Sequence, residues 1–197
     1  MRDDKKVLLL AGIMAFVLFS GGCRSKEMET EKTIVSTKAH QSETVMPEER
    51  NFGIVDGVDF TGNEMSEDIF TGYDLTLVNV WATFCNPCLE EMPDLNEIYG
   101  EYTKTGKSFQ MVGVCMDAMT LTGIDESIFN SAKEIEKTLN LSYLNIVPGE
   151  ALMSGALAGV SAVPTTFFVD SNGNIMDTVI GSRSKEAWIE IIDGFLE

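Results

Sequence analysis

Two cysteines separated by two residues stand at the junction between a predicted strand and a predicted helix. Cys85 and Cys88 belong to the segment W-A-T-F-C-N-P-C, which directly follows the apolar run 75–80. A helix that begins here would point its free N–H groups and the positive end of its dipole at the Cys85 sulfur, which favours the thiolate. Cys88 would lie about one turn further along, within reach of Cys85 for a reducible disulfide. The spacing therefore predicts thiol–disulfide exchange, in which Cys85 attacks and Cys88 resolves the mixed disulfide.

Other roles for the cysteines remain open from the residues alone. The pair could be buried structural residues or half of a zinc site, although zinc needs further ligands and the single histidine, His40, lies in a polar segment. A third cysteine, Cys115, lies in the apolar run 111–116. It is either a small buried hydrophobic residue or a further thiol that resolves a mixed disulfide.

Further along the chain, V-P-T-T at 163–166 opens another apolar run, and Asn172-Gly173 follows as a strong turn pair. Together with W-A-x-x-C-x-P-C, this pattern resembles the thioredoxin superfamily. Within it, the chain is most similar to the TlpA/ResA-type membrane-anchored thiol–disulfide reductases. The resemblance covers about residues 51–197. It implies a cis peptide bond before Pro164, which faces the two cysteines.

The same resemblance implies which residues meet a substrate. The backbone of Val163 and Pro164 is implied to pair with the substrate strand near its cysteine, so Pro164 counts as both a catalytic and a substrate-binding residue. We expect Trp81 to pack beside the active-site helix as a further substrate-binding residue, with a core position as an equal alternative. Phe84 stands where the family commonly has a Trp before the first cysteine.

Resolution of a mixed disulfide requires a group that removes the proton of Cys88. The strand position at which thioredoxin itself carries a buried Asp is occupied by Asn79, which cannot ionise. TlpA/ResA-type proteins instead have a Glu three residues after the second cysteine, and Glu91 stands there. This spacing puts Glu91 on the same helix face as Cys88. We therefore expect Glu91 to accept the proton; the alternative is a solvated Glu that only favours the helix dipole.

Residues 1–22 have the pattern of a signal peptide: a basic start, an apolar stretch at 7–19 that is too short to span a bilayer comfortably, and small residues after it. The following S-G-G-C resembles a bacterial lipobox, which implies cleavage before Cys23 and a lipid on its sulfur. Ser20 stands where the lipobox usually has Leu, so ordinary signal cleavage and an uncleaved anchor remain alternatives. Residues 23–48 are polar, and we expect a disordered tether. The domain is thus expected on the extracytoplasmic face of the cell membrane.

The net charge of the chain limits the classes of partner that it can bind. The formal net charge is -17, and loss of residues 1–22, which hold three basic and two acidic residues, would make it -18. Such a domain repels phosphate backbones and anionic lipid surfaces, so nucleic-acid binding is disfavoured. The resemblance instead implies protein substrates with disulfides, such as apocytochrome c or surface methionine sulfoxide reductase, and a CcdA/DsbD-type membrane electron donor. No cofactor or metal is required, and we expect a monomer.

Residues 49–197 are expected to form one α/β domain with a thioredoxin-like fold, in which helices flank a central mixed sheet. The resemblance adds a TlpA-type insertion at 117–147, and turn signals suggest an N-terminal hairpin within about 52–63. Apolar runs place strands at 75–82, 109–116, 141–147, 166–170 and 175–180. Helical periodicity places helices at 87–106, 126–139, 150–158 and 184–196.

Two other functions compete with a protein disulfide reductase. Thiol peroxidases of the peroxiredoxin type share the fold, but they require a Thr and an Arg near the reactive cysteine, and no Arg lies between Arg50 and Arg183. A metal chaperone or another binding lipoprotein is the second. Copper chaperones of related fold use C-x-x-x-C with a His, and this chain has neither that spacing nor a His in the domain. The reductase remains the leading prediction.

Overall fold

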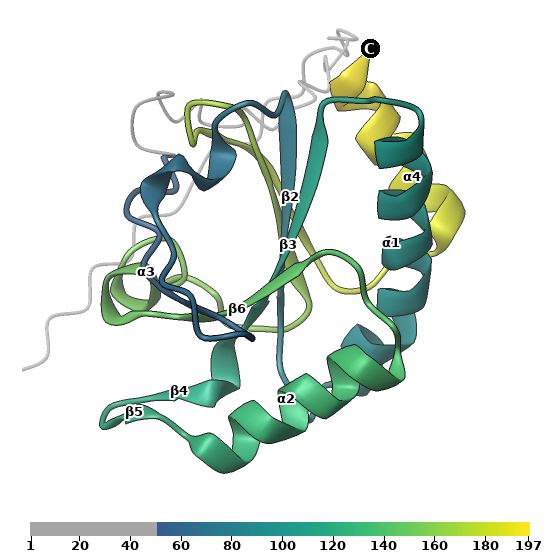
Figure 1. Cartoon of the computed structure of the whole chain (residues 1–197). Helices are drawn as coiled ribbons and strands as arrows, with labels where there is room; N and C mark the ends of the chain where they lie inside the picture. The colour runs from purple at the N-terminus through teal and green to yellow at the C-terminus, as the bar shows by residue number, and fades with distance from the viewer. Residues whose placement is uncertain (1–50) are drawn as a thin grey trace, which may run out of the picture. The chain divides into compact units, whose positions relative to one another are not determined.

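The computed structural model describes residues 51–197, so the predicted signal peptide, the lipid-attachment residue Cys23 and the tether at 23–48 lie outside the described residues. The described chain forms a six-stranded sheet in the order β1-β6-β3-β2-β7-β8 (Figure 1). The strands β2, β3 and β6 run parallel, whereas β1, β7 and β8 are antiparallel to their neighbours. They span Gly57–Asp59 (β1), Leu75–Trp81 (β2), Phe109–Cys115 (β3), Leu144–Pro148 (β6), Thr165–Val169 (β7) and Ile175–Ile180 (β8). The predicted mixed sheet is confirmed.

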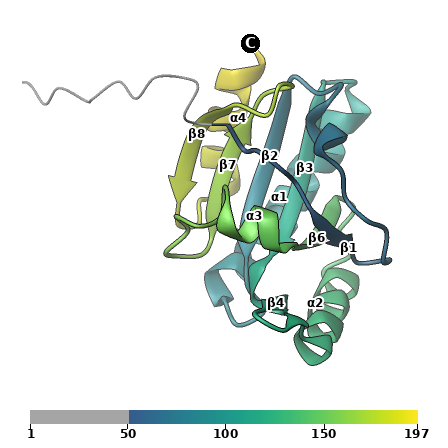
Figure 2. The same cartoon turned by 90° about the vertical axis from the view of Figure 1, so that its left-hand side faces the viewer.

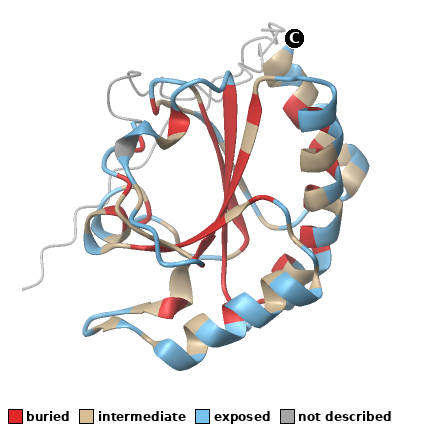
Figure 3. Cartoon of the chain, viewed as in Figure 1, coloured by how far each residue is buried: buried red, intermediate tan, exposed pale blue. Residues whose placement is uncertain are grey.

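Helices cover both faces of this sheet, as predicted. α1 (Asn86–Lys104) and α4 (Lys185–Leu196) pack on one face, and the short α3 (Glu150–Ser154) lies on the other (Figures 1 and 2). The central strand β2 is buried along its whole length (Figure 3). Because side chains alternate along a strand, Leu77 joins the apolar cluster of α1 and α4, and Val78 joins the cluster of α3. Within residues 51–197, no helix is both long and apolar enough to cross a membrane.

α1 begins at the two cysteines and carries the site on its first turns. Cys85 is the N-cap residue, and Pro87 lies in the first turn, where its missing N–H is not needed. Pro93 lies inside the helix, so one carbonyl of the preceding turn lacks its usual partner. The predicted helix 87–106 is confirmed, although it starts one residue earlier and ends at Lys104.

α2 (Glu126–Thr138) lies beyond the end of β3, near the start of α1 (Figure 1). The Asp125 carboxylate caps its first turn by accepting hydrogen bonds from the N–H groups of Ser127 and Ile128. Its inner face contributes the buried Ala132 to the apolar cluster that also holds both cysteines of the motif. α2 therefore forms one side of the site.

The predicted N-terminal hairpin is reduced to a tight loop. β1 pairs with β6, and toward the segment that follows it makes one isolated bridge, between Val58 and Glu64. The Asp59 carboxylate accepts hydrogen bonds from the N–H groups of Thr61 and Asn63, which closes the chain over too few residues for a second strand. A short 3-10 helix, η2 (Glu67–Phe70), precedes β2.

Between β3 and α2 the chain forms elements that sequence patterns do not predict. A short 3-10 helix, η3 (Met116–Ala118), leads into a hairpin of β4 (Met119–Thr120) and β5 (Gly123–Ile124). Strands of two residues carry no readable period, so the pattern analysis misses them. That the segment 117–147 is an insertion stays a prediction.

In the second half of the domain, one helix is shorter than predicted and one hairpin forms as predicted. α3 spans five residues instead of 150–158, because the chain leaves the helical conformation at Gly155. β7 and β8 form the predicted antiparallel hairpin. The Asp170 carboxylate holds its turn by accepting hydrogen bonds from the N–H groups of Asn172 and Asn174.

Candidate active site

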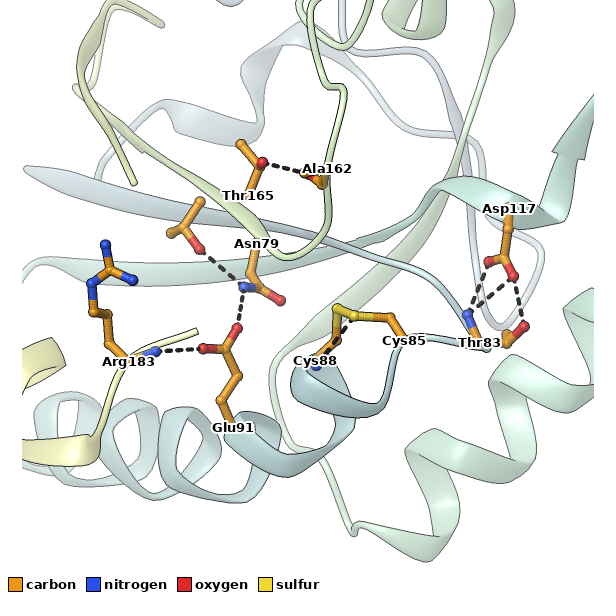
Figure 4. Close-up of a disulfide and its surroundings, with 10 residues drawn as sticks. Asn79, Thr83, Cys85, Cys88, Glu91, Asp117, Ala162, Thr165 and Arg183 are labelled. Carbon is orange, nitrogen blue, oxygen red and sulfur yellow. Dashed lines mark hydrogen bonds between the residues drawn. A yellow bond between two sulfur atoms is a disulfide. The ribbon is translucent and has the colours of Figure 1, made fainter. Parts of the chain in front are cut away.

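Cys85 and Cys88 form a disulfide at the N-terminus of α1 (Figure 4). Cys85 has the extended backbone of an N-cap residue, and its sulfur accepts a hydrogen bond from the Cys88 N–H at 3.3 Å. Cys85 keeps 6% of its surface exposed, whereas Cys88 keeps 0%. Cys85 is therefore also buried, but it is the member of the pair that a partner can reach.

The local field at Cys85 favours a thiolate once the disulfide is reduced. The Cys88 N–H and the positive end of the α1 dipole both face the Cys85 sulfur. The first turn of α1 carries no acidic side chain that would oppose them. Cys85 is therefore suited to attack a disulfide.

Glu91 lies one turn beyond Cys88 and is buried, with 3% of its surface exposed. Its Oε1 accepts a hydrogen bond from Asn79 Nδ2 at 3.1 Å. Its Oε2 accepts two more, from the Arg183 backbone N–H at 3.2 Å and from Trp188 Nε1 at 3.3 Å. Burial raises the pKa of the Glu91 carboxyl group, although these hydrogen bonds and the Arg183 charge oppose the rise. Glu91 is thus not the solvated Glu of the alternative interpretation.

Asn79 connects Glu91 to the sheet. Its Nδ2 also donates to Thr166 Oγ1 at 3.0 Å, across the β2–β7 pair in which these two residues are register partners. Its Oδ1 is buried, has no hydrogen-bond partner among the described residues, and points toward the disulfide in Figure 4. Sequence reasoning set Asn79 aside because it cannot ionise. The alternation of side chains along β2 could have indicated its position, because it puts Asn79 on the same face of the strand as Leu77 and Trp81.

The Val163–Pro164 peptide bond is cis, as the resemblance implied. Val163 is half-buried and packs against the apolar cluster that contains Cys85 and Cys88. Pro164 is buried, and its carbonyl accepts a hydrogen bond from the Gly181 N–H at 2.8 Å. Within residues 51–197, no backbone–backbone hydrogen bond uses the N–H or carbonyl of Val163. The fold therefore brings backbone groups without backbone partners next to the disulfide.

Trp81 packs beside the start of α1, as expected, but leaves no surface exposed to a substrate. Its side chain is fully buried in the cluster that supports the two cysteines, which is the core alternative. Gly113, on the neighbouring strand, leaves room for the indole, since a Cβ there would lie 3.2 Å from Trp81 Nε1. Trp81 therefore supports the two cysteines as part of the apolar core beneath the active site.

The aromatic side chain that is exposed beside the disulfide is Phe84, with 75% of its surface accessible. Phe84 borders a groove of about 590 Å³ between the segment before α1 and α2. The groove is lined by Thr83, Phe84, Asn130, Ser131, Glu134 and Ile135. It offers apolar and polar contacts directly beside Cys85. Sequence reasoning noted Phe84 only as a replacement for Trp.

Cys115 is fully buried at the end of β3, where it is the register partner of Trp81 on β2. Its thiol donates a hydrogen bond to Asp117 Oδ1 at 3.2 Å. Asp117 also accepts hydrogen bonds from the N–H and hydroxyl of Thr83 (Figure 4). Burial and the Asp117 charge raise the pKa of the Cys115 thiol. These features favour the small buried hydrophobic residue over a third exchanging thiol.

The alternative chemistries find little support in the described residues. No three His, Cys, Asp or Glu side chains within 51–197 gather where they could share a metal ion. The Arg183 guanidinium, which a peroxidase site would need near its cysteine, donates instead to the carbonyls of Gly181 and Ser182.

Comparison with known proteins agrees with this geometry. The thiol-disulfide oxidoreductase ResA of a Bacillus cereus strain is 27% identical over 192 residues, which cover 97% of this chain and 91% of the relative. The crystal structure of a thiol:disulfide interchange protein of the thioredoxin family from Chlorobium tepidum TLS is 25% identical, with a TM-score of 0.57 over 73% of this chain and 94% of the other. StoA from Bacillus subtilis is similar in fold, with a TM-score of 0.53 and 20% identity over 70% and 92% of the two chains.

These similarities confirm the thioredoxin-like fold and the predicted resemblance to ResA-type proteins. With the Cys85–Cys88 disulfide at the start of α1, they identify a thiol–disulfide oxidoreductase. A family model described as AhpC/TSA matches residues 51–178, which contain both cysteines, Glu91 and Pro164. The chain belongs to the AhpC/TSA family.

Proposed function

We propose that this chain is an extracytoplasmic protein disulfide reductase that works by dithiol exchange at Cys85 and Cys88. The observation that carries the proposal is the unequal burial of the two cysteines next to a buried carboxyl group. Cys85 can be reached from outside, Cys88 cannot, and Glu91 lies one turn beyond Cys88. This is the arrangement that an attacking thiol, a resolving thiol and a proton acceptor require.

In the first step, the Cys85 thiolate attacks one sulfur of a substrate disulfide. A mixed disulfide forms, and the second substrate sulfur leaves as a thiolate that takes up a proton. The Cys88 N–H and the α1 dipole stabilise the attacking thiolate. The exposed position of Cys85, relative to Cys88, decides which sulfur reacts.

In the second step, Cys88 resolves the mixed disulfide. The Cys88 thiol loses its proton, the thiolate attacks the Cys85 sulfur, and the substrate sulfur leaves as a thiolate. Glu91 accepts the proton. A carboxyl group of ordinary pKa would hold a proton too weakly for this task near neutral pH, so the raised pKa of Glu91 suits it.

The substrate is held from two sides of Cys85. On one side, the backbone of Val163 and Pro164 pairs with the extended substrate segment around its cysteine, which is supported by the absence of internal backbone partners for Val163 within residues 51–197. On the other side, Phe84 and α2 provide the groove described above. Such a site favours unfolded or flexible protein segments over compact ones.

The location is inferred from the sequence pattern outside the described residues, and the electron donor and acceptors are inferred from the family resemblance. Residues 1–22 direct export, Cys23 carries the lipid anchor, and 23–48 tether the domain. A CcdA/DsbD-type membrane protein returns electrons to the oxidised dithiol. Apocytochrome c or surface redox enzymes such as methionine sulfoxide reductase then receive them. The name of the ResA relatives supports thiol–disulfide exchange, the reaction that this assignment requires.

The reduction potential of the Cys85–Cys88 couple tests the direction of the reaction. We expect a value near that of thioredoxin, roughly -270 mV, when the protein is equilibrated with defined thiol buffers. A value near roughly -120 mV, as in strong disulfide donors, would contradict the reductase. The Cys88→Ser variant should then trap substrates as mixed disulfides at Cys85, and a lipid mass on Cys23 in membranes of expressing cells would establish the anchor.

A further inference from the structure

The three groups that bond Glu91 differ in what they can do when its carboxylate is protonated. The Arg183 backbone N–H and the Trp188 indole N–H, both on Oε2, are donors only. The third partner, Asn79 on Oε1, has a donor at one end of its amide and an acceptor at the other. A half-turn of that amide would present Oδ1 to a protonated Oε1. Asn79 is therefore the one partner of the three that can bond both forms of Glu91.

The other end of the Asn79 amide points at the cysteines. Its Oδ1 is buried, without a hydrogen-bond partner among the described residues, and directed toward the disulfide (Figure 4). A buried acceptor without a donor destabilises the state in which it is left unpaired. The disulfide has no proton to offer, but a reduced Cys88 has one. The unpartnered oxygen thus stands where the reduced form would supply a donor.

We propose that the Asn79 amide is a rotating hydrogen-bond bridge that links the proton of Cys88 to the proton of Glu91. The inference deepens the proposed function, since it rests on Glu91 as the proton acceptor. Asn79 is a positioning residue in this account, because it acts through Glu91 and Cys88 and exchanges no atoms itself.

The bridge has two states with the same number of protons. In the first, Glu91 is ionised, Asn79 Nδ2 donates to Oε1, and Oδ1 accepts from the Cys88 thiol. In the second, the proton has left Cys88, Oε1 carries a proton, and the amide has turned. Oδ1 then accepts from Glu91, and Nδ2 donates to the Cys88 thiolate.

Thr166 can keep a hydrogen bond to the Asn79 side chain when the amide makes this half-turn. Its hydroxyl accepts from Asn79 Nδ2 in the structure and can donate to Oδ1 after the rotation, because a hydroxyl is both donor and acceptor. Both orientations of the amide therefore leave its neighbours satisfied. One catalytic cycle therefore uses each of the two orientations of the Asn79 amide once.

Other ionisable groups face Glu91 from the neighbouring elements. Arg183 lies in the segment before α4, and its charge opposes the rise in the Glu91 pKa. Tyr143 lies just before β6, and burial together with the Glu91 charge raises its pKa further above the usual range. A guanidinium keeps its charge and such a phenol keeps its proton at neutral pH. The proton is therefore shared between Cys88 and Glu91, with Cys85 as the remaining group that ionises at the site.

A double-mutant cycle tests the bridge. The readout is the rate at which Cys88 displaces a coloured aromatic thiol from a mixed disulfide on Cys85, as a function of pH, in the full-length protein. We expect Glu91→Gln to slow this step by about 10²-fold when Asn79 is present. In the Asn79→Leu background, Glu91→Gln should alter the rate by no more than about twofold. This is the deviation from additivity that mutations at independent sites usually show.

Each outcome of the cycle separates the bridge from the proposed function. An equal effect of Glu91→Gln in both backgrounds overturns the bridge but leaves Glu91 as the acceptor. No effect of Glu91→Gln in either background contradicts both. Asn145 provides the matched control, because it is a buried Asn on β6 whose Oδ1 also has no partner among the described residues. Asn145→Leu should leave the Glu91→Gln effect unchanged, and loss of the effect there would overturn the specific role of Asn79.

A second measurement needs no variant that could fail to fold. In the reduced, isotope-labelled protein, the NMR signals of the Asn79 side-chain amide should shift with pH at the same midpoint as the Glu91 carboxyl signal. The amide signals of Asn96, whose side-chain hydrogen bonds within residues 51–197 go to Asn140 and Ser142 and to no ionisable side chain, serve as the internal reference. Asn79 signals that stay constant while Glu91 titrates would overturn the bridge.

Discussion

Two buried cysteines, Cys88 within the site and Cys115 near it, each have a carboxyl group nearby, but the two carboxyl groups differ in how far they are buried. Cys115 donates directly to Asp117, which is half-buried and also accepts two hydrogen bonds from Thr83. Burial and the Asp117 charge raise the pKa of Cys115, so this thiol keeps its proton. Beyond Cys88, by contrast, lies a carboxyl group that is itself buried and has a raised pKa.

We infer from this difference that a carboxylate beside a thiol does not by itself activate the thiol. An ionised carboxylate next to a thiol opposes the thiolate by repulsion of like charges. A buried carboxyl group with a raised pKa removes that repulsion when it takes up the proton. On this account, Glu91 serves catalysis and Asp117 serves the structure of the loop before α1.

Replacing the thiols should give the largest contrast. Cys88→Ala removes the resolving sulfur, so we expect complete loss of turnover with a protein disulfide and accumulation of the mixed disulfide at Cys85. Cys115→Ala should keep turnover within about twofold of the original, as expected of a site that does not couple to the reaction. Steady-state reduction of a protein disulfide measures both. Loss of turnover in Cys115→Ala would contradict this contrast between the two cysteines, because Cys115 would then take part in the exchange.

Replacing the carboxyl groups should give the next contrast. Glu91→Gln leaves the shape of the side chain but removes the proton acceptor, so the resolving step at pH 7 should slow by about 10²-fold. Asp117→Asn should change that step by no more than about twofold. Single-turnover release of a substrate thiol measures both rates. Equal losses in the two variants would mean that general electrostatics, and not proton transfer, explains the effect.

Asp117 should instead matter for stability. Asp117→Ala removes the partner of the Thr83 N–H and hydroxyl, and we expect a loss of about 1–3 kcal/mol in the free energy of unfolding. Urea denaturation of the oxidised protein measures this loss. The pKa of Cys115 should fall only partly toward its usual value, because burial, the larger cause of the rise, remains. A variant of unchanged stability would show that the loop before α1 is held by other contacts.

The pH dependence of stability should give the smallest contrast. The pKa of Glu91 is raised in the folded protein, so the folded state binds this proton more tightly than the unfolded chain does. Its contribution to stability is fully present below the unfolded pKa and is lost as pH rises through the folded pKa. The unfolding free energy of the oxidised protein, measured from acid to neutral pH, should therefore fall less in Glu91→Gln than in the original protein. Parallel curves would show that burial does not perturb this group.

The mixed sheet and the place of the disulfide could be predicted from the sequence alone, because a short motif and long periodic runs carry these features. The cis peptide bond before Pro164 was implied by the family resemblance. The sequence did not predict the partners of Glu91, since Arg183 and Trp188 come from the last helix and its preceding segment and meet Glu91 only in the folded chain. The full burial of Trp81 could not be predicted either, because the type of an aromatic residue near a motif does not place it inside or outside the core.

Asn79 was set aside for a related reason. Its lack of charge excluded it as an acid or base, and sequence patterns do not show that an amide can link two groups that do ionise. The pairing with Thr166 depends on the register of β2 and β7, which are far apart in the chain. Local propensity determines most of the elements, whereas the polar contacts of the site depend on the tertiary structure.

The most direct test of the central claim is the pH profile of the resolving step in the original protein and in Glu91→Gln, measured side by side from a preformed mixed disulfide on Cys85. If Glu91 takes the proton of Cys88, the rate in the original protein rises through the raised pKa of the carboxyl group and then levels. In Glu91→Gln this rise should vanish, which leaves only the slower increase from ordinary ionisation of a thiol. Two profiles of the same shape and height would contradict the account, because Cys88 would then lose its proton without Glu91.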